Sequence, residues 1–390
     1  MHKVEKGNAA YIKNMNKRLV LQCVIDHQPT SRAEISKKIN ISKPTVSGLV
    51  DQLLEDGWIY ETGSGEASAN GGRKPVHLCF NPRFAYVIGV DIGGTKVASG
   101  ISDLNGNICA YREFPTQKNL ESGLLEHIQL DIESMKEELN LSDDQILGMG
   151  VGVPGMTNVE EGIVYESPAL GWKQYPIREK LSQYFDFPIF VDNDVNINVL
   201  GEHWKGAGQQ KANLIYIAIG TGIGSGIMLN GQLYRGSNYS AGEIGYLVTD
   251  RIFARNYHPV YEGFGFLESV SSGSSIGDQL TKKIGSRATA QEAFQMYQQG
   301  HKDAVEIIDS AVENLALGIA NYVSLFDPEI IILGGGVSRS YSMISEKINE
   351  IIERFAPKRC EVVATTFGKE AGVIGAVALF LKEFDTIFAI

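Results

Sequence analysis

The stretch that decides the fold is residues 89–96, "GVDIGGTK", an apolar run that breaks into two glycines, a threonine and a lysine. This pattern is typical of a strand that turns sharply where backbone N–H groups can approach an anion such as phosphate. The run continues as "VASGISDLNGNICAY", which predicts a second strand, an Asn-Gly turn and a third strand.

A similar unit recurs at residues 214–236, "LIYIAIGTGIGSGIMLNGQLYRG", so the body of the chain is internally duplicated. Strands such as "PIFVDN" and "EIIILGGG" alternate with helical patterns, which predicts two α/β lobes. The helical patterns cover residues 119–139, 195–206, 302–325 and 371–384. Two glycine turns facing each other across a cleft would hold the phosphates of a nucleotide from both sides, with "LGGG" at 333–336 beside the adenosine.

Polar side chains suited to a sugar lie between and after the two turns. The segment "VDNDVNINVLGEHW" places Asn193 and Asp194 at the end of a predicted strand, where ligands of α/β lobes bind. A carboxylate there can take a proton from a sugar hydroxyl, and the amide can hold a second hydroxyl. Asp194 is equally suited to cap the following helix. Glu243 in "SAGEIGY" and Glu268 in "GFGFLES" offer further acceptors.

The first eighty residues differ in texture from the body and predict three helices. Residues 16–27 have apolar side chains at helical spacing, and Ser31 with Glu34 forms a capping-box pattern for the second helix. The third helix has Ser42 as its N-cap and Pro44 in its first turn, and it ends at Gly57.

The third helix has an apolar stripe that leaves a small, polar face exposed. The stripe consists of Val46, Leu49, Val50, Leu53 and Leu54. Small and hydroxyl-bearing residues on the other face suit entry into a DNA major groove, although a helical domain with a solvated face is the plainer interpretation. The expected DNA-contacting residues are Ser42, Lys43, Pro44, Thr45, Ser47, Gly48 and Gln52.

The segment "WIYETGSGEASANGGRKPVHLCF" favours DNA binding, because it predicts two strands joined by a glycine-rich tip, the wing of a winged helix. Arg73 and Lys74 in that tip suit a narrow, A·T-rich minor groove. The distribution of charge also favours DNA binding by this part of the chain: residues 1–85 carry a net charge of +4, whereas the rest of the 390-residue chain carries −15.

Other features of the composition exclude several classes of protein. No run approaches the eighteen apolar residues of a membrane span, and the N-terminus has no signal-peptide core, so a cytoplasmic protein is expected. The four cysteines are far apart, which suggests neither a disulfide framework nor a cysteine zinc site.

Together these motifs resemble the ROK family, which groups bacterial repressors, sugar kinases and uncharacterised reading frames. The resemblance rests on "VDIGGTK", "GVPG" at 152–155, "VDNDVN", "IGTGIGSG", "GEIGY" and "LGGG", and the front module is similar to that of the repressor branch, including its xylose-repressor-like members. It implies an N-terminal winged helix-turn-helix followed by an α/β actin-like (ribonuclease H-like, duplicated) two-lobed sugar-kinase fold. The expected domains are 1–82, 83–195 and 196–390, with the last helix (371–384) packing back on the first lobe.

The resemblance also implies roles for single residues. The sugar-binding positions are Asn193, Asp194, Glu243, Tyr246 and Glu268, with Asp194 as the catalytic base if the protein is a kinase. The phosphate motifs correspond to Asp91, Gly93, Gly94, Thr95 and Lys96, and to Gly220, Thr221, Gly222 and Gly224.

The chain departs from the family at its zinc site. The positions expected to hold one histidine and three cysteines hold Tyr246, Pro259, Tyr261 and Phe266, none of which is a suitable zinc ligand. No zinc or other cofactor is therefore expected, and ATP with magnesium only if the protein is a kinase. The histidine of the family also contacts the sugar, so Tyr246 alters the wall of that site.

Three functions are consistent with these residues. The first is a sugar-responsive transcriptional repressor of carbohydrate-utilisation genes that binds a palindromic, A/T-rich operator as a homodimer or homotetramer. The second is an ATP-dependent, glucokinase-like sugar kinase with an added DNA-binding domain. The third is a DNA-binding protein whose body only dimerises. The sequence identifies neither the sugar nor the direction of its effect.

Overall fold

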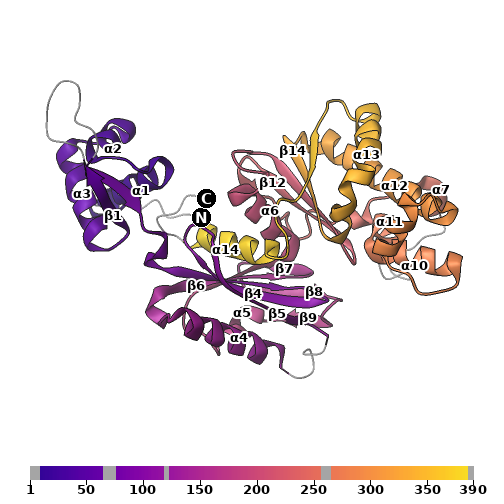
Figure 1. The fold of residues 1–390 in the computed structure, drawn as a ribbon, viewed down its shortest axis with the longest axis horizontal. Helices are drawn as coiled ribbons and strands as arrows, with labels where there is room; N and C mark the ends of the chain where they lie inside the picture. The colour runs from indigo at the N-terminus through magenta and orange to yellow at the C-terminus, as the bar shows by residue number, and fades with distance from the viewer. Residues whose placement is uncertain (1–8, 65–75, 118–122, 256–264, 385–390) are drawn as a thin grey trace.

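The computed structural model describes residues 9–64, 76–117, 123–255 and 265–384. An N-terminal helical module precedes two α/β lobes, with the last helix, α14 (Ala371–Glu383), lying between them (Figure 1). None of the helices in these ranges is both long and apolar enough to cross a membrane.

The N-terminal module is a winged helix-turn-helix, as the sequence predicts. Ser31 and Glu34 form the capping box of the second helix, and the Ser42 hydroxyl accepts the N–H of Thr45 at the start of the third. Strands β1 and β2 pair antiparallel, with Ile59 opposite Phe80. The first helix begins earlier than residue 16, because residues 9–15 contain no glycine or proline to stop it. The elements are α1 (Ala9–His27), α2 (Arg32–Ile39), α3 (Lys43–Glu55), β1 (Ile59–Ser64), β2 (Val76–Phe80) and the 3₁₀ turn η1 (Pro82–Phe84).

The first lobe contains a five-stranded sheet in the order β10-β6-β3-β4-β5. Strands β3, β4 and β5 are antiparallel neighbours, whereas β3, β6 and β10 run parallel. Helix α4 packs on β4 and β5, and β7–β9 form a small separate sheet. The strands are β3 (Tyr86–Ile92), β4 (Lys96–Asp103), β5 (Ile108–Pro115), β6 (Ile146–Val153), β7 (Met156–Asn158), β8 (Ile163–Ser167), β9 (Trp172–Tyr175) and β10 (Ile189–Asn193). The helical elements are α4 (Leu124–Leu139), η2 (Asp143–Gln145) and α5 (Ile177–Leu181).

The second lobe repeats this plan. Its sheet has the order β13-β12-β11-β14-β15, so each sheet places its first strand between its second and fourth, which is the duplication that the two glycine hairpins predict. Strands β11, β14 and β15 run parallel, and β12 pairs antiparallel with β11. The strands are β11 (Leu214–Ile219), β12 (Ile223–Leu229), β13 (Gln232–Leu233), β14 (Ile330–Gly334) and β15 (Glu361–Ala364).

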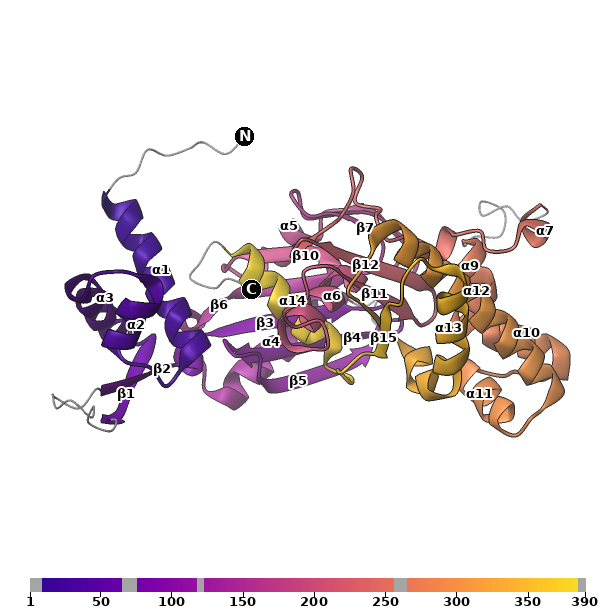
Figure 2. The same cartoon turned by 90° about the horizontal axis from the view of Figure 1, so that it is seen from above.

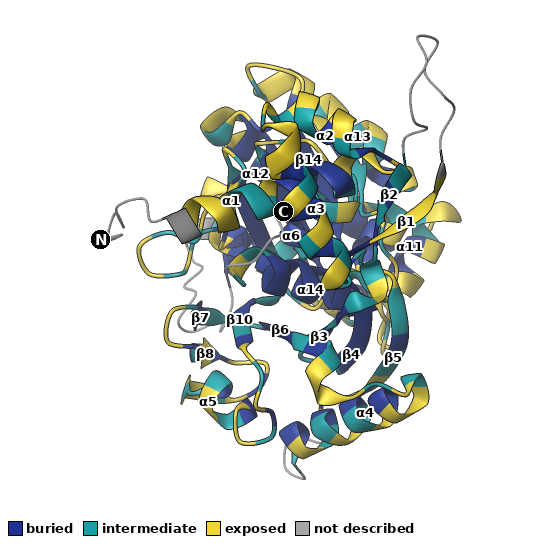
Figure 3. Cartoon of the chain, turned by 90° about the vertical axis from the view of Figure 1, so that its left-hand side faces the viewer, coloured by how far each residue is buried: buried dark blue, intermediate teal, exposed yellow. Residues whose placement is uncertain are grey.

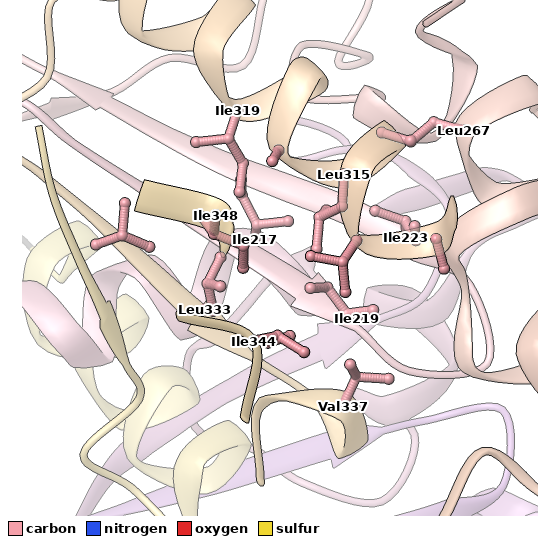
Figure 4. Close-up of a cluster of buried hydrophobic side chains, with 14 of the residues drawn as sticks. Ile217, Ile219, Ile223, Leu267, Leu315, Ile319, Leu333, Val337, Ile344 and Ile348 are labelled. Atoms are coloured by element: carbon pink, nitrogen blue, oxygen red, sulfur yellow. The ribbon is translucent and has the colours of Figure 1, made fainter. Parts of the chain in front are cut away.

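A group of helices covers one face of the second sheet. Residues Leu315 and Ile319 of α12 pack with Ile217 of β11 and Ile348 of α13 in a continuous apolar core (Figure 4). The helical elements are η3 (Ile244–Tyr246), α7 (Arg251–Ala254), α9 (Phe266–Ser271), α10 (Gly273–Ile284), α11 (Ala290–Gln298), α12 (Lys302–Phe326), η4 (Gly336–Ser340) and α13 (Tyr341–Phe355).

Helices α6 (Asp194–Lys205) and α14 form the centre of the body and pack closely against each other (Figure 2). Residues 372–381 of α14 are all buried (Figure 3). Glycines make this approach possible: a Cβ on Gly150 would overlap the carbonyl of Ala376, and a Cβ on Gly375 would overlap the carbonyl of Ile197. Helix α14 therefore contacts the sheet of the first lobe and also α6.

The same helix contributes to an apolar core that extends into the winged helix. Residues Val377, Phe380 and Leu381 of α14 belong to the apolar core that contains Leu53 and Phe80 of the winged-helix module. The backbone N–H of Leu104, after β4, donates to the carbonyl of Pro82. The module is thus packed against the body by a shared core and is not merely tethered to it.

Candidate functional site

The turn from β10 into α6 places two of the predicted sugar-binding residues. The Asn193 side chain is the N-cap of α6: its Oδ1 accepts the N–H groups of Val195 (2.8 Å) and Asn196 (3.2 Å), while its Nδ2 donates to the carbonyl of Gly155 (3.1 Å). The capping role that Asp194 could have filled therefore belongs to Asn193. Asp194 is the first residue of the helix, and its Oδ1 accepts the N–H of Val195 at 3.0 Å. A carboxylate has further lone pairs with which to accept hydroxyl groups.

Two glutamates from the second lobe lie near Asp194. Glu243 precedes η3, and Glu268 lies in the first turn of α9. Desolvation raises the pKa of Glu243, and the charges of Glu268 and Asp194 raise it further, although the residue remains exposed to solvent. Burial raises the pKa of Glu268, and the hydrogen bond from the N–H of Ile223 partly offsets this rise. Burial also raises the pKa of Asp194, to about 6. The fold thus gathers three carboxyl groups from two lobes at one place.

Tyr246 completes this group at the end of η3. It is 58% exposed, and its pKa is raised by burial and then by the neighbouring charges of Glu243 and Glu268. The structure therefore brings together all five predicted sugar-binding residues. Carboxylates and an amide that converge beside an aromatic ring are the groups that bind polyols.

The first glycine turn links β3 to β4. The N–H of Gly93 donates to the carbonyl of Lys96 (2.9 Å), and the Thr116 hydroxyl donates to the carbonyl of Gly93 (2.6 Å), so the turn is closed by its own bonds. Thr95 is exposed at its tip. Gly94 faces the side chain of Ala169, where an added Cβ would lie 3.0 Å away.

Two charged residues of the first phosphate motif differ in their surroundings. Lys96 forms an ion pair with Glu113 of β5 (2.8 Å), in which both side chains are partly exposed. Asp91 lies against Gly372 at the start of α14, and burial, followed by the charge of Asp194, raises its pKa to about 7. Sequence reasoning missed the Lys96–Glu113 pair, because it depends on the pairing of β4 with β5.

The second glycine turn links β11 to β12. The N–H of Gly220 donates to the carbonyl of Gly222 (2.9 Å), and Thr221 is exposed. The N–H of Gly273, the first residue of α10, donates to the carbonyl of Gly220 (2.8 Å). Gly224 lies within β12 and not at the tip of the turn. An added Cβ there would meet Val195 of α6 at 3.1 Å, so Gly224 allows the strand to pack closely on the helix.

The winged helix places most of the predicted DNA-contacting residues on its surface. Ser42, Lys43, Pro44, Thr45 and Gly48 are exposed at the N-terminal end of α3. Gln52 and Ser47 are half-buried, and the Ser47 hydroxyl accepts a bond from Arg32 of α2 (3.2 Å), which also pairs with Asp51 (2.8 Å). Thr45 instead bonds the hydroxyl of Ser42 (2.8 Å). Arg73 and Lys74 lie outside the described residues.

Part of the region that replaces the family's zinc site is described. Phe266 is buried at the start of α9, whereas Pro259, Tyr261 and Phe264 lie outside the described residues. Within those ranges, no cluster of three or more histidine, cysteine, aspartate or glutamate side chains is arranged to hold a metal ion. The absence of zinc stays a prediction.

Sequence reasoning also missed an ion pair next to the candidate sugar-binding turn between β10 and α6. Asp192, 1% exposed at the end of β10, pairs with Arg235 (2.8 Å), which follows β13. An acidic residue within an apolar strand is a signal of a buried charge that needs a partner. The partner itself could not be found, because Arg235 lies in the other lobe.

Comparison with known proteins agrees with this arrangement. The sequence model of the ROK family matches residues 87–383, and that of the MarR family matches residues 13–64. The xylose repressor of Caldicellulosiruptor bescii is 30% identical over 97% of this chain and 98% of its own length. The glucokinase of Thermotoga maritima is 32% identical over 76% of this chain and 97% of its own length, so it lacks a counterpart of the N-terminal part.

Solved structures show the same fold. A ROK family transcriptional regulator, described as a homologue of the E. coli MLC protein, superposes with a TM-score of 0.79 at 24% identity and covers 94% of this chain and 96% of its own. A ROK family glucokinase from Streptomyces griseus, solved with glucose and AMPPNP, has a TM-score of 0.64 at 28% identity, over 76% of this chain and 99% of its own.

Proposed function

This chain belongs to the ROK family, and we propose that it is a transcriptional repressor that D-xylose releases from its operator. The match to xylose repressors over nearly the whole chain, together with the winged helix, supports a sugar-responsive repressor. D-Xylose is proposed because those relatives carry its name.

One observation supports the sensing part of this proposal: the candidate acceptors for a sugar come from both lobes. Asn193 is the last residue of β10, in the sheet of the first lobe, and Asp194 directly follows it as the first residue of α6. Glu243 and Glu268 belong to the second lobe. A sugar that bonds to both groups favours one relative position of the lobes, and it can change the equilibrium only by binding that position more tightly. Helix α14 shares a core with the winged helix, so the lobes and the DNA-binding module are mechanically connected.

The DNA part of the proposal assigns α3 to the major groove, through Thr45 and its exposed neighbours. Arg73 and Lys74 are proposed to enter an A/T-rich minor groove. Because two winged helices are needed to read a palindrome, the operator is proposed to bind a homodimer or a pair of dimers, in the cytoplasm, where the chromosome lies.

A sugar kinase is the second candidate, and specific observations favour it. Both glycine turns are intact, and the raised pKa of Asp194 suits a group that accepts a proton from a hydroxyl. Against turnover, Glu113 competes with a ligand for Lys96, and Tyr246 replaces the family's histidine. Phosphoryl transfer requires in-line placement to within about 1 Å. We therefore propose sugar binding without appreciable phosphorylation, and neither zinc nor another cofactor.

The test separates the candidates with one protein preparation. Operator binding is followed by fluorescence anisotropy with and without D-xylose, and ADP release is measured with the same sugar and ATP. Loss of operator affinity without ADP release supports the repressor. ADP release at about 1–100 s⁻¹, the usual range for kinases, supports the kinase.

A further inference from the structure

Arg235 joins three separate parts of the chain. It follows β13 in the second lobe, and its Nε donates to Oδ2 of Asp192, in β10 of the first lobe, at 2.8 Å. Its Nη2 lies 3.1 Å from Oε1 of Glu383, in the last turn of α14. A single guanidinium therefore bridges both lobes and the helix between them.

Asp192, Arg235 and Glu383 are called the triad below. The Asp192 end of the triad fixes the candidate sugar-binding turn. The other oxygen of Asp192, Oδ1, accepts the backbone N–H of Asn193 (2.7 Å) and Nδ2 of Asn196 (2.9 Å). These bonds hold the residues on either side of Asp194. Because Asp192 is 1% exposed, loss of Arg235 would leave a buried carboxylate without its cation, so this pair is expected to persist in every folded state.

The Glu383 end lies in the turn of α14 that contributes to the core shared with the winged helix. The neighbouring Lys382 donates to the carbonyl of Gly231 (3.2 Å), which ties the same turn of α14 to the β12–β13 hairpin. Phe380 stacks on Phe384 with ring centroids 4.7 Å apart, and Phe380 belongs to the core that α14 shares with the winged helix. The last turn of α14 thus contacts the second lobe and also contributes to the apolar core that extends into the DNA-binding module.

We propose that Arg235 is a positioning residue that couples the sugar site to the winged helix through Asp192 on one side and Glu383 on the other. The proposal rests on the proposed function, since it takes the sugar to bind beside Asp194. The side chain of Glu383 is 39% exposed, and exposed ion pairs are weak. When sugar binding changes the relative position of the lobes, the Arg235–Glu383 contact is therefore the bond that breaks or forms at little cost. Helix α14 then shifts, and the shift reaches the DNA-binding module through their shared core.

The first test measures coupling in the full-length protein. Glu383→Gln keeps the size of the side chain and removes its charge. Glu353→Gln is the matched control, since it removes the exposed pair (2.7 Å) between Glu353, near the end of α13, and Arg359. Operator affinity is measured by anisotropy with and without saturating D-xylose. Glu383→Gln should leave the sugar-free operator affinity and the xylose affinity within about twofold of wild type. The factor by which xylose weakens operator binding should fall about fivefold or more, within the usual range of allosteric coupling. An unchanged factor overturns the proposal.

A second measurement needs no sugar. Hydrogen exchange followed by mass spectrometry compares wild type, Arg235→Lys, Glu383→Gln and the Glu353→Gln control. We expect faster exchange at the start of α6 in Arg235→Lys and at the end of α14 in both triad variants, with no change in the control. If Arg235→Lys does not fold, Glu383→Gln carries the comparison. Unchanged exchange in the folded triad variants contradicts the coupling. In the operator-binding test, by contrast, a wild-type protein that does not respond to D-xylose counts against the proposed effector alone.

Discussion

The carboxylate of Glu268 accepts a hydrogen bond of 2.8 Å from the backbone N–H of Ile223, the first residue of β12. Glu268 comes from α9, so this bond connects a candidate sugar acceptor to the second glycine turn. An added Cβ on Gly222 of that turn would lie 2.5 Å from Oε2 of the same glutamate. The position of Glu268 therefore depends on the turn having no side chain at Gly222.

Gly222→Ala should displace Glu268 and weaken xylose binding by about tenfold, the effect of losing one hydrogen bond to a charged group. The fold should survive, because the added methyl group meets the end of a side chain and not backbone. Gly220→Ala is the matched control in the same turn, since no atom lies within 4 Å of its added Cβ. Isothermal calorimetry of both variants checks this; equal xylose affinities in the two would place Glu268 outside the sugar site.

Xylose affinity should rise with pH between about 5 and 7.5. Burial raises the pKa of Asp194 to about 6, and only the ionised carboxylate accepts hydroxyl donors at both oxygens. One pH unit below that pKa, about a tenth of the group is ionised, so affinity at pH 5 should be about tenfold lower than at pH 7.5. Asp194→Asn should bind weakly with a flatter profile. A wild-type affinity independent of pH would show that Asp194 does not contact the sugar.

The contribution of Asp194 to the stability of the sugar-free protein should fall as pH rises, opposite to the trend of xylose affinity. A raised pKa means that the folded state holds the proton of Asp194 more tightly than the unfolded chain does. This stabilising contribution is present below the ordinary aspartate pKa and is lost as pH rises through about 6. Asp194→Asn should therefore melt at a higher temperature than wild type at pH 8, with a smaller difference at pH 5. Calorimetry in which the difference grows toward pH 5 would contradict the assignment.

Thr45→Ala should reduce discrimination between operator bases by ~1–3 kcal/mol, because the Thr45 side chain is exposed and its hydroxyl, bonded to that of Ser42 (2.8 Å), retains bonding capacity for the major groove. Ser47 is also among the residues that the sequence predicts to contact DNA. Because the Ser47 hydroxyl is bonded to Arg32, its loss should affect discrimination less than the loss of Thr45. Anisotropy with the operator and with single-base variants measures both. Greater loss of discrimination in Ser47→Ala would reverse the assignment.

Protein purified without chelators should contain far less than one zinc ion per chain. Tyr246 and Phe266 occupy two of the positions where the family is expected to carry ligands, and neither side chain binds zinc as histidine or cysteine does. Inductively coupled plasma mass spectrometry gives the zinc content directly, and near-stoichiometric zinc would refute this prediction.

Local signals in the sequence predicted much of the fold, because they act over a few residues. Ser42 and Pro44 mark the start of α3, and the repeated glycine hairpins reveal the duplicated sheets. Family motifs supplied the five residues that converge at the candidate sugar site. Pairings that cross lobes or strands escaped prediction: Arg235 with Asp192 and Lys96 with Glu113 each depend on tertiary contacts that no spacing encodes. Likewise, either Asn193 or Asp194 could cap α6, and only the geometry of the turn decides between them.

The measurement that tests the central claim most directly is operator binding by the full-length protein as D-xylose is added, in wild type and in Asp194→Asn. If sugar bound between the lobes controls the winged helix, xylose should weaken wild-type binding by about tenfold or more, within the usual range of allosteric coupling. Asp194→Asn should bind the operator as wild type does without sugar and respond little to xylose. Wild-type binding unchanged by xylose and by every other monosaccharide tried, or an undiminished response in Asp194→Asn, would contradict the account.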